Sequence, residues 1–308
     1  MIRYIDMYRS RFGVEPICRT LQATEGGFIT ARGYRMVKTR PVSARRVRDQ
    51  LLADQVARLH QANYSVYGVR KMHAAMIREG WHVGRDQVAR LMRAAGLHGV
   101  TRSRRVFTTR PDTTLAQPGD LLERQFTASA PQQAWVADIT YVATWAGFAY
   151  VGFITDVFSR RIVGWSVSST LRTDQSTLAA LDMAAWQAGD DLTGLICHND
   201  HGSNYLSIAY TSRVLELGAR LSTGSVGDAY DNALAETVNG LYKAELIRRH
   251  GPWRTIEQVE LATLSWVYWW NNQRLHQTLG YHTPTEAEQA YYTEHNPSRL
   301  APATRDKH

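Results

Sequence analysis

The chain has 308 residues, of which 44% are apolar, and its 36 Lys+Arg against 28 Asp+Glu give a formal net charge of +8. At roughly 150 residues per domain, this length predicts about two domains, and the apolar content excludes a disordered chain. No apolar run reaches about 18 residues, which excludes a membrane-spanning helix. Only Cys18 and Cys197 are present, which excludes a disulfide scaffold and a thiolate zinc cluster. The scarce cysteines and a start without an apolar signal segment favour the reducing cytoplasm.

The charge is divided unevenly along the chain. Residues 1–130 hold 23 basic and 10 acidic residues, a net charge of +13, whereas residues 131–308 have a net charge of −5. Arginine supplies 32 of the 36 basic residues. A basic half favours a polyanionic partner, because phosphate contacts release counterions. The alternative is an ordinary basic surface in a chain with a compositional bias toward arginine.

The first half of the chain is predicted to be helical. Apolar residues at helical spacing predict helices over residues 14–21, 44–60, 67–77 and 85–95, with Gly80 and Gly96 ending the last two. Two short helices joined by a tight turn are typical of a helix-turn-helix, whose second helix can enter the major groove. The outer face of the predicted second helix carries Arg85, Arg90 and Arg93. The alternative is a solvated basic face that binds nothing.

The second half is predicted to be α/β. Residues 101–131 contain three prolines and no periodicity, which indicates a linker. Strands are predicted over residues 135–142, 148–155, 162–167, 194–198 and 219–222, and helices over 173–186, 206–217, 231–248 and 255–270. The first three strands form an antiparallel meander and the later two add parallel strands, which predicts a mixed five-stranded sheet flanked by helices. The predicted parts are an N-terminal helical segment (1–43), a helix-turn-helix region (44–110), a linker (111–131), a catalytic core (132–290) and a C-terminal tail (291–308).

Three acidic residues occupy positions that the predicted sheet brings together. Asp138 lies within an apolar strand, Asp200 follows the fourth strand, and Glu236 lies on the helix after the fifth strand. A carboxylate in an apolar strand is costly unless it is paired or binds a cation. Three convergent carboxylates suit Mg²⁺ or Mn²⁺, and two such ions can stabilise both oxygens of a phosphodiester displacement. For a single mid-strand aspartate the alternative is a structural charge.

Other residues are given structural interpretations. Asp156 and Asp228 lie where turns are expected, and turn chemistry accounts for both. Cys197 is expected to be a small buried strand residue. Trp266, Tyr268, Trp269 and Trp270 are expected to pack along a helix, and base stacking is the alternative for one of them.

The spacing and the segments around the acids resemble a known family. Asp200 and Glu236 are separated by 35 residues. The segments are Trp135–Tyr141 (WVADITY), Asp156–Trp165 (DVFSRRIVGW), His198–Tyr205 (HNDHGSNY), Gly227–Ala233 (GDAYDNA) and Asn271–Tyr281 (NNQRLHQTLGY). Together they resemble the D,D-35-E core of transposases and retroviral integrases, and more narrowly the OrfB-type transposases of the insertion-sequence-three family. The segment from Tyr67 to Arg93 resembles the helix-turn-helix of that family.

The resemblance implies an RNase H-like fold with strand order 3-2-1-4-5, and it implies Asp138, Asp200 and Glu236 as metal-binding catalytic acids with two Mg²⁺ or Mn²⁺ ions. Lys243 matches the basic residue seven positions after the glutamate in the family, so a contact with a DNA phosphate is expected. Further DNA contacts are expected from the following residues: Asn232, Asn239, Arg70, Lys71, Arg85, Arg90 and Arg93.

The expected function is that of a DNA transposase of a bacterial insertion sequence. Such an enzyme nicks the element ends, and each freed 3′-OH attacks target DNA without a covalent protein–DNA intermediate. The expected partners are the terminal inverted repeats, target DNA, at least one further copy of the chain, and the product of an upstream reading frame, separate or fused. No membrane partner is expected, and the expected location is the bacterial cytoplasm at the nucleoid.

Four other interpretations stand beside this one. A tyrosine recombinase would use Arg274, His276 and Tyr281, but no all-helical catalytic domain surrounds them. A simple RNase H-type nuclease would share the acids without needing the basic first half. A transcription regulator would use the helix-turn-helix and would not use the acids. The fourth is a degenerate, inactive copy, although no residue of the acidic triad is missing.

Overall fold

The computed structural model describes residues 1–24, 29–101, 127–172, 176–199, 205, 207–223 and 233–295. The chain forms two compact units, Met1–Gln55 and Val56–His308. Within the described ranges, no helix is both long enough and apolar enough to cross a membrane. Most of the predicted linker, the acid Asp200 and the amide Asn232 lie outside the described residues.

The first unit contains three short helices and the start of a longer one. Helices α1 (Ile2–Phe12), α2 (Val14–Gln22) and α3 (Ala31–Thr39) precede α4 (Ala44–Ala62). The chain reverses between α1 and α2 at Gly13, whose φ of 77° is a left-handed value that favours glycine. Ile5, Ile17, Cys18 and Tyr34 form the small core of this unit.

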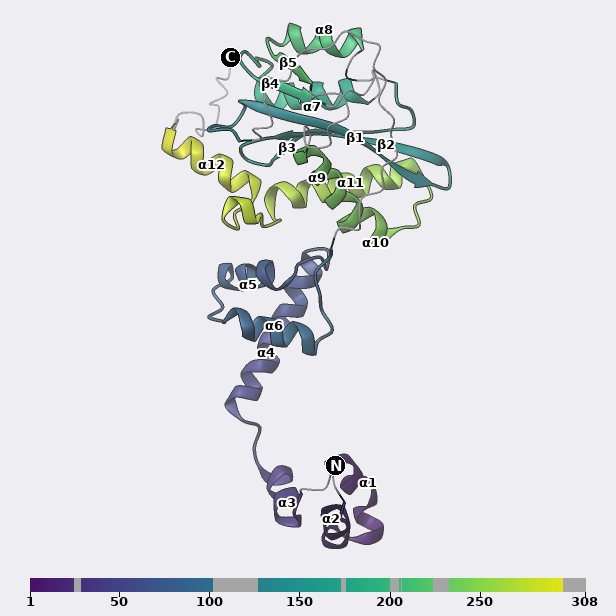
Figure 1. Cartoon of the computed structure of the whole chain (residues 1–308), viewed down its shortest axis with the longest axis vertical. Coiled ribbons are helices and arrows are strands. Elements are labelled where there is room, and N and C mark those ends of the chain that lie inside the picture. Colours follow the sequence, from purple (N-terminus) through teal and green to yellow (C-terminus); the bar gives the residue numbers. More distant parts are fainter. Residues whose placement is uncertain are drawn as a thin grey trace, which may run out of the picture. The chain divides into compact units, whose positions relative to one another are not determined.

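The second unit begins with the two helices of the predicted helix-turn-helix (Figure 1). Helix α5 (Val69–Arg78) and helix α6 (Arg85–Ala94) pack on each other. Each buries the apolar stripe that its sequence predicts, with Met72 and Met76 on α5 and Val88 and Leu91 on α6. The spacing of apolar residues therefore determines these helices locally.

A mixed sheet forms the centre of the second unit. Its strands are β1 (Ala134–Thr144), β2 (Gly147–Asp156), β3 (Ile162–Ser168), β4 (Ile196–Asn199) and β5 (Arg220–Thr223). The strand order is β3-β2-β1-β4-β5; β1, β2 and β3 are antiparallel neighbours, and β4 and β5 run parallel to β1. This arrangement confirms the predicted RNase H-like topology, and it makes β1 the central strand.

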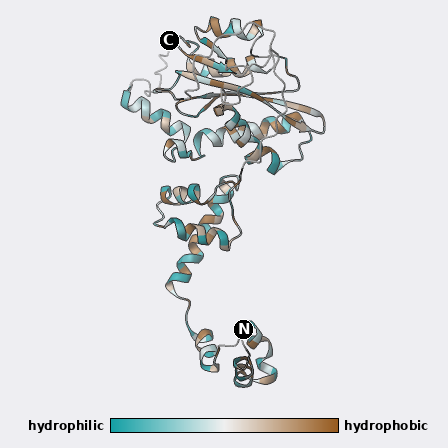
Figure 2. Cartoon of the chain, in the orientation of Figure 1, coloured by the Kyte–Doolittle hydropathy of each residue, from teal (hydrophilic) through white to brown (hydrophobic). Residues whose placement is uncertain are grey.

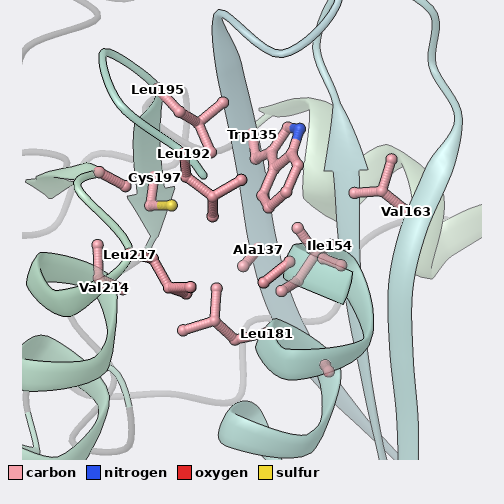
Figure 3. Close-up of a cluster of buried hydrophobic side chains, with 14 of the residues drawn as sticks. Trp135, Ala137, Ile154, Val163, Leu181, Leu192, Leu195, Cys197, Val214 and Leu217 are labelled. Atoms are coloured by element: carbon pink, nitrogen blue, oxygen red, sulfur yellow. The ribbon is translucent and has the colours of Figure 1, made fainter. Parts of the chain in front are cut away.

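Helices cover both faces of the sheet (Figure 1). Helices α7 (Thr177–Ala188) and α8 (Ile208–Glu216) lie on one face, and α9 (Ala233–Tyr242) and α11 (Ile256–Asn272) lie on the other. Figure 3 shows the core on the α7 side, where Trp135 and Ala137 of β1 meet Leu181 of α7 and Val214 of α8. Hydrophobic residues run along the strands (Figure 2), as expected for a sheet covered on both faces.

Two features depart from the sequence expectations. The predicted helix over residues 231–248 is interrupted, because α9 is followed by a π-helical turn, η2 (Lys243–Ile247), and a short α10 (Arg248–His250). The pattern also does not predict α12 (Pro284–His295), which follows the 3₁₀ turn η3 (Gln277–Leu279). Its contacts with the rest of the chain include an ion pair between Arg161 and Glu288 and the packing of the Tyr291 ring on Phe158.

Candidate active site

Asp138 lies on the face of β1 that is covered by α9. Side chains alternate along a strand, so Trp135 and Ala137 enter the core under α7, whereas Val136 packs with Ala235 of α9. Asp138 is two residues after Val136, so its side chain lies on this second face, where it is half-buried. The alternation of β1 therefore directs a carboxylate toward the helix that carries Glu236.

Asn239 holds the carboxylate of Asp138. Its Nδ2 donates a hydrogen bond to Asp138 Oδ2 at 2.8 Å, and the backbone N–H of Ile139 donates to Asp138 Oδ1 at 2.8 Å. Asn239 is buried, and its Oδ1 has no hydrogen-bond partner within the described part of the chain. This amide orients an acid on the sheet, whereas the sequence predicted a DNA contact for it.

Glu236 lies one helical turn before Asn239 on α9. Residues three apart share a face of a helix, so the contact of Asn239 with Asp138 brings the Glu236 side of α9 toward β1. The parallel pairing of β1 with β4 ends at Ala137 and Asn199, one residue before Asp138 and Asp200 in the chain. Among the described residues, no group of three His, Cys, Asp or Glu side chains could hold a metal.

Lys243 lies close to the same carboxylate. It begins the π-helical turn after α9, and its Nζ lies 4.8 Å from the centroid of the Tyr141 ring. Burial and the charge of Arg248 lower the pKa of Lys243, and the Asp138 carboxylate opposes this shift. A half-buried lysine beside an acidic group differs from an ordinary solvated surface lysine.

A second charged cluster lies beside this site, and the sequence did not predict it. Arg274 and Glu245 form a buried bidentate ion pair, with Nε to Oε2 at 3.0 Å and Nη2 to Oε1 at 2.6 Å. His276 is also buried, 3.4 Å from Arg274, and burial lowers its pKa well below the usual value. Arg274 and His276 therefore build the protein interior, which removes the basic cluster that a tyrosine recombinase would need near Tyr281. The one sequence signal was a glutamate within the apolar run Ala244–Ile247.

The predicted DNA contacts of the helix-turn-helix differ in exposure. Arg70, Arg85, Arg90 and Arg93 are exposed on α5 and α6. Lys71 is partly buried, with its Nζ 5.3 Å from the centroid of the Tyr67 ring. Burial, reinforced by the Arg274 charge, lowers the pKa of Lys71 to about 7. Tertiary packing thus partly covers Lys71, and its contact with a DNA phosphate stays a prediction.

Two structural interpretations hold, and one is partly wrong. Asp156 is buried in its turn, where Oδ1 accepts from the backbone and hydroxyl of Ser159 and Oδ2 accepts from the Gln132 N–H, each at 2.8 Å. Cys197 is buried in β4. The tryptophans of α11 are buried as expected, but Tyr268 is 61% exposed because it faces away from the sheet side of the helix. Asp228 lies outside the described residues.

The sequence is similar to characterised families along most of its length. Two family models described as "Integrase core domain" match residues 128–229 and 217–284. A third model, described as "HTH-like domain", matches residues 46–105. The chain is 47% identical to the transposase for insertion sequence element IS629 of Shigella sonnei over 292 residues, 95% of this chain and 97% of the relative. The chain belongs to the insertion-sequence-three family of transposases. It is also 51% identical to the putative transposase for IS986/IS6110 of Mycobacterium tuberculosis over 83% of its own length and 93% of the relative.

The matched regions of this transposase coincide with its structural parts. The HTH-like match covers α5 and α6, and the two core matches together contain Asp138, Glu236, Asn239 and Lys243. Among solved structures, the chain is similar to the HTLV-2 integrase catalytic core domain in complex with magnesium, at 17% identity and a TM-score of 0.41, over 53% of this chain and 99% of that one. The family models and the transposase relatives show that the chain is an enzyme with an integrase core and a helix-turn-helix region.

Proposed function

We propose that this transposase cuts the ends of its insertion sequence and joins them to target DNA at one site built on Asp138, Asp200 and Glu236. The observation that carries the proposal is the hydrogen bond between Asn239 and Asp138. This bond connects the helix that carries Glu236 to the strand that carries Asp138. The chain belongs to a transposase family whose reaction is polynucleotidyl transfer.

The donor set fits a hard divalent cation. Carboxylate oxygens are the ligands that Mg²⁺ and Mn²⁺ prefer, and the buried Oδ1 of Asn239 adds an amide oxygen without a partner among the described residues. Asp138, Asp200 and Glu236 would hold two such ions. When bound, the ions would stabilise the attacking and leaving oxygens of an in-line displacement.

The side chains of the chain itself would position the reacting groups. Asn239 and the Ile139 N–H fix the rotamer of Asp138 through both carboxylate oxygens. Lys243, with its ammonium close to Asp138, would contact a phosphate of the element end. Asn232, which lies outside the described residues, is proposed to contact DNA as well. These contacts hold the scissile phosphate in line with its nucleophile.

The reaction has two displacements at the same site. Water first attacks the phosphorus at the element end, and the bond from this phosphorus to the 3′ oxygen of the element breaks, which leaves a 3′-OH on the element and a 5′-phosphate on the flanking strand. That 3′-OH then attacks a phosphorus of the target, and the bond from this phosphorus to the target's own 3′ oxygen breaks. The number of phosphodiester bonds is conserved in the second step, so joining requires no external energy source.

The helix-turn-helix would bind the terminal inverted repeats. Arg70, Arg85, Arg90 and Arg93 are exposed on its two helices and are proposed to contact DNA. Because both ends of the element must be held together, we expect at least a dimer on DNA, at the nucleoid in the cytoplasm, with the product of an upstream reading frame as a further partner.

The test is a strand-transfer assay with the full chain. Purified protein, Mg²⁺ and DNA carrying the element ends should give nicked ends and joined products. Asp138→Asn, Asp200→Asn and Glu236→Gln should bind the same DNA and give neither product. Joining that survives in Asp200→Asn would contradict the proposal, as would a protein–DNA adduct that resists denaturation.

A further inference from the structure

A basic groove lies between α5 and the turn that contains η3. It has a volume of about 630 Å³ and is lined on one side by Arg70 and His73 of α5, and on the other by Gln277, Tyr281 and His282. Both sides belong to the second compact unit. The groove therefore joins the helix-turn-helix to the last segment of the integrase core.

The α5 side presents one continuous helix face. Arg70, His73 and Ile77 are spaced at i, i+3 and i+7, so they point in the same direction. Arg70 is exposed, and its guanidinium group makes no hydrogen bond or ion pair with any residue that the structure describes. Arg85 also lines the groove, and its ion pair with Asp86, at 3.5 Å, is exposed and therefore weak. These two guanidinium groups are available to an anionic ligand.

The opposite side is a turn held in one conformation. The N–H of Tyr281 donates to the His276 carbonyl at 2.8 Å, and the N–H of His276 donates to the His282 carbonyl at 3.1 Å. Tyr281 has a φ of 66°, a left-handed value that bulky residues rarely adopt. Arg78 of α5 donates to the Tyr281 carbonyl at 3.4 Å and pairs with Glu286. Backbone strain of this kind persists only where surrounding contacts enforce it, so the wall is rigid.

The charge of the groove selects an anion. No acidic residue is among its lining residues, which include three arginines and two histidines. Glu286 lies behind the wall, where it neutralises Arg78 and lies 3.6 Å from His282. Arg70 and Arg85, the latter in only a weak exposed ion pair with Asp86, then supply the positive charge of the groove, and Gln277 adds an exposed amide donor. A concave basic surface of this kind attracts phosphates.

We propose that this groove binds the phosphate backbone of the DNA duplex, so that one duplex contacts α5 and the core turn at once. The proposal rests on the proposed function, because DNA is the substrate of that function. The groove adds contacts of Gln277 and His282, from the integrase core, with the DNA backbone. Without it, the DNA contacts of this region would come from the helix-turn-helix alone. Binding energy from the helix-turn-helix would thereby also orient the core on the same duplex.

The experiment measures duplex binding by fluorescence anisotropy with the full chain, in EDTA, over a series of salt concentrations. Arg70→Ala and Arg85→Ala should each weaken binding to end-containing and random duplexes alike and lower the salt slope by about 1. Gln277→Glu places a carboxylate in the groove from the core side and should weaken binding about tenfold or more, as expected for a charge facing a phosphate.

Two matched controls lie outside the groove. Gln289→Glu makes the same charge change on the exposed surface of α12, and Arg213→Ala removes an arginine that pairs with Asp182 on the far helices. Both should bind DNA within about twofold of the wild type, as surface changes away from phosphates do. All variants alter exposed residues, and equal melting temperatures would show that each is folded.

The outcomes separate this inference from the proposed function. Wild-type affinity in Gln277→Glu, together with weaker binding in Arg70→Ala, would mean that the helix-turn-helix binds DNA alone and would overturn the composite groove. Wild-type affinity in all groove variants would overturn it as well. The binding assay requires neither metal nor strand joining. Weaker binding in the groove variants would therefore support the groove even if the wild type failed to nick and join DNA, a result that would contradict only the proposed function.

Discussion

Lys243 and Glu245 are two residues apart in the π-helical turn, yet their charges are balanced in different ways. Glu245 meets Arg274 in a buried bidentate pair that satisfies both groups inside the protein. Lys243 is half-buried; burial and the charge of Arg248 lower its pKa, and the opposing charge is the carboxylate of Asp138. The extra residue in a π-helical turn changes which side chains face inward, and such turns recur at functional sites. Here it separates a structural charge from one that faces the proposed DNA site.

The same contrast holds between two aspartates on adjacent strands. Asp156 is 2% exposed, and both of its oxygens are saturated by donors from its own turn and from Gln132. Asp138 is more exposed, and its bonds include one from the backbone and one from Asn239, whose own oxygen lacks a partner among the described residues. A saturated, buried carboxylate stabilises a fold, whereas a partly exposed carboxylate on the sheet is accessible to a ligand.

The largest expected effect tests the contrast between Asp138 and Asp156. Asp138→Asn should lower strand joining by about 10³-fold or more, because a metal ligand is lost, with little change in melting temperature. Asp156→Asn should instead lower the melting temperature, and the folded fraction should still join strands. A paired strand-transfer and thermal-melting measurement checks this. Equal loss of stability in both variants would mean that Asp138 is structural.

Breaking the buried pair should have the next largest effect. Glu245→Gln leaves Arg274 buried without its counter-charge, which should cost about 3–5 kcal/mol of unfolding free energy. The double variant Glu245→Leu with Arg274→Met should be less destabilised than Glu245→Gln alone, because no charge is then left unpaired. Denaturant titration measures both. As a control, Arg213→Ala, at an exposed pair, should cost no more than about 1 kcal/mol.

Asn239→Leu tests the residue that links the helix to the strand. Loss of the hydrogen bond to Asp138 should raise the Mg²⁺ concentration needed for half-maximal joining by about 10- to 100-fold, as expected for a residue that orients a metal ligand. DNA binding in EDTA should stay unchanged. If DNA affinity falls and the Mg²⁺ dependence does not move, Asn239 contacts DNA, as the sequence alone suggested.

The smallest expected effect concerns Lys243 and depends on pH. Because burial lowers its pKa, the ammonium loses its proton at a lower pH than an ordinary lysine, and a phosphate contact made by the charged form weakens as pH rises through that pKa. Lys243→Arg should keep end binding at alkaline pH, where the wild type weakens. Lys243→Gln should be weak at all pH values, with a salt slope lower by about 0.9. Identical pH profiles for wild type and Lys243→Arg would exclude this contact.

Much of the fold was accessible from the sequence because its signals are local. Alternation in residues 135–142 and the helical stripe of residues 85–95 predicted elements whose ends moved by only a few residues in the structure. The order of strands and helices then limited the sheet to a few topologies, and the predicted one is observed. Helix α12 was missed because long-range contacts, such as that of Glu288 with Arg161, hold it in place of an apolar stripe.

The sequence by itself determined the elements, the order of the sheet and the positions of the acids along the chain. Only the tertiary structure decided which charges are buried and which face a ligand, because the partners come from distant segments. Glu245 and Arg274 are 29 residues apart, and the Leu275 N–H donates to the hydroxyl of Tyr67, 208 residues away. The sequence offered Arg274 and His276 as the basic cluster of a recombinase and Lys71 as a DNA contact, whereas in the folded protein Arg274 and His276 are buried and Lys71 is partly buried. The net charge of +13 in the first 130 residues likewise does not tell that Arg70 is exposed while its neighbour Lys71 is partly buried. The burial of a charge depends on which residues pack around it.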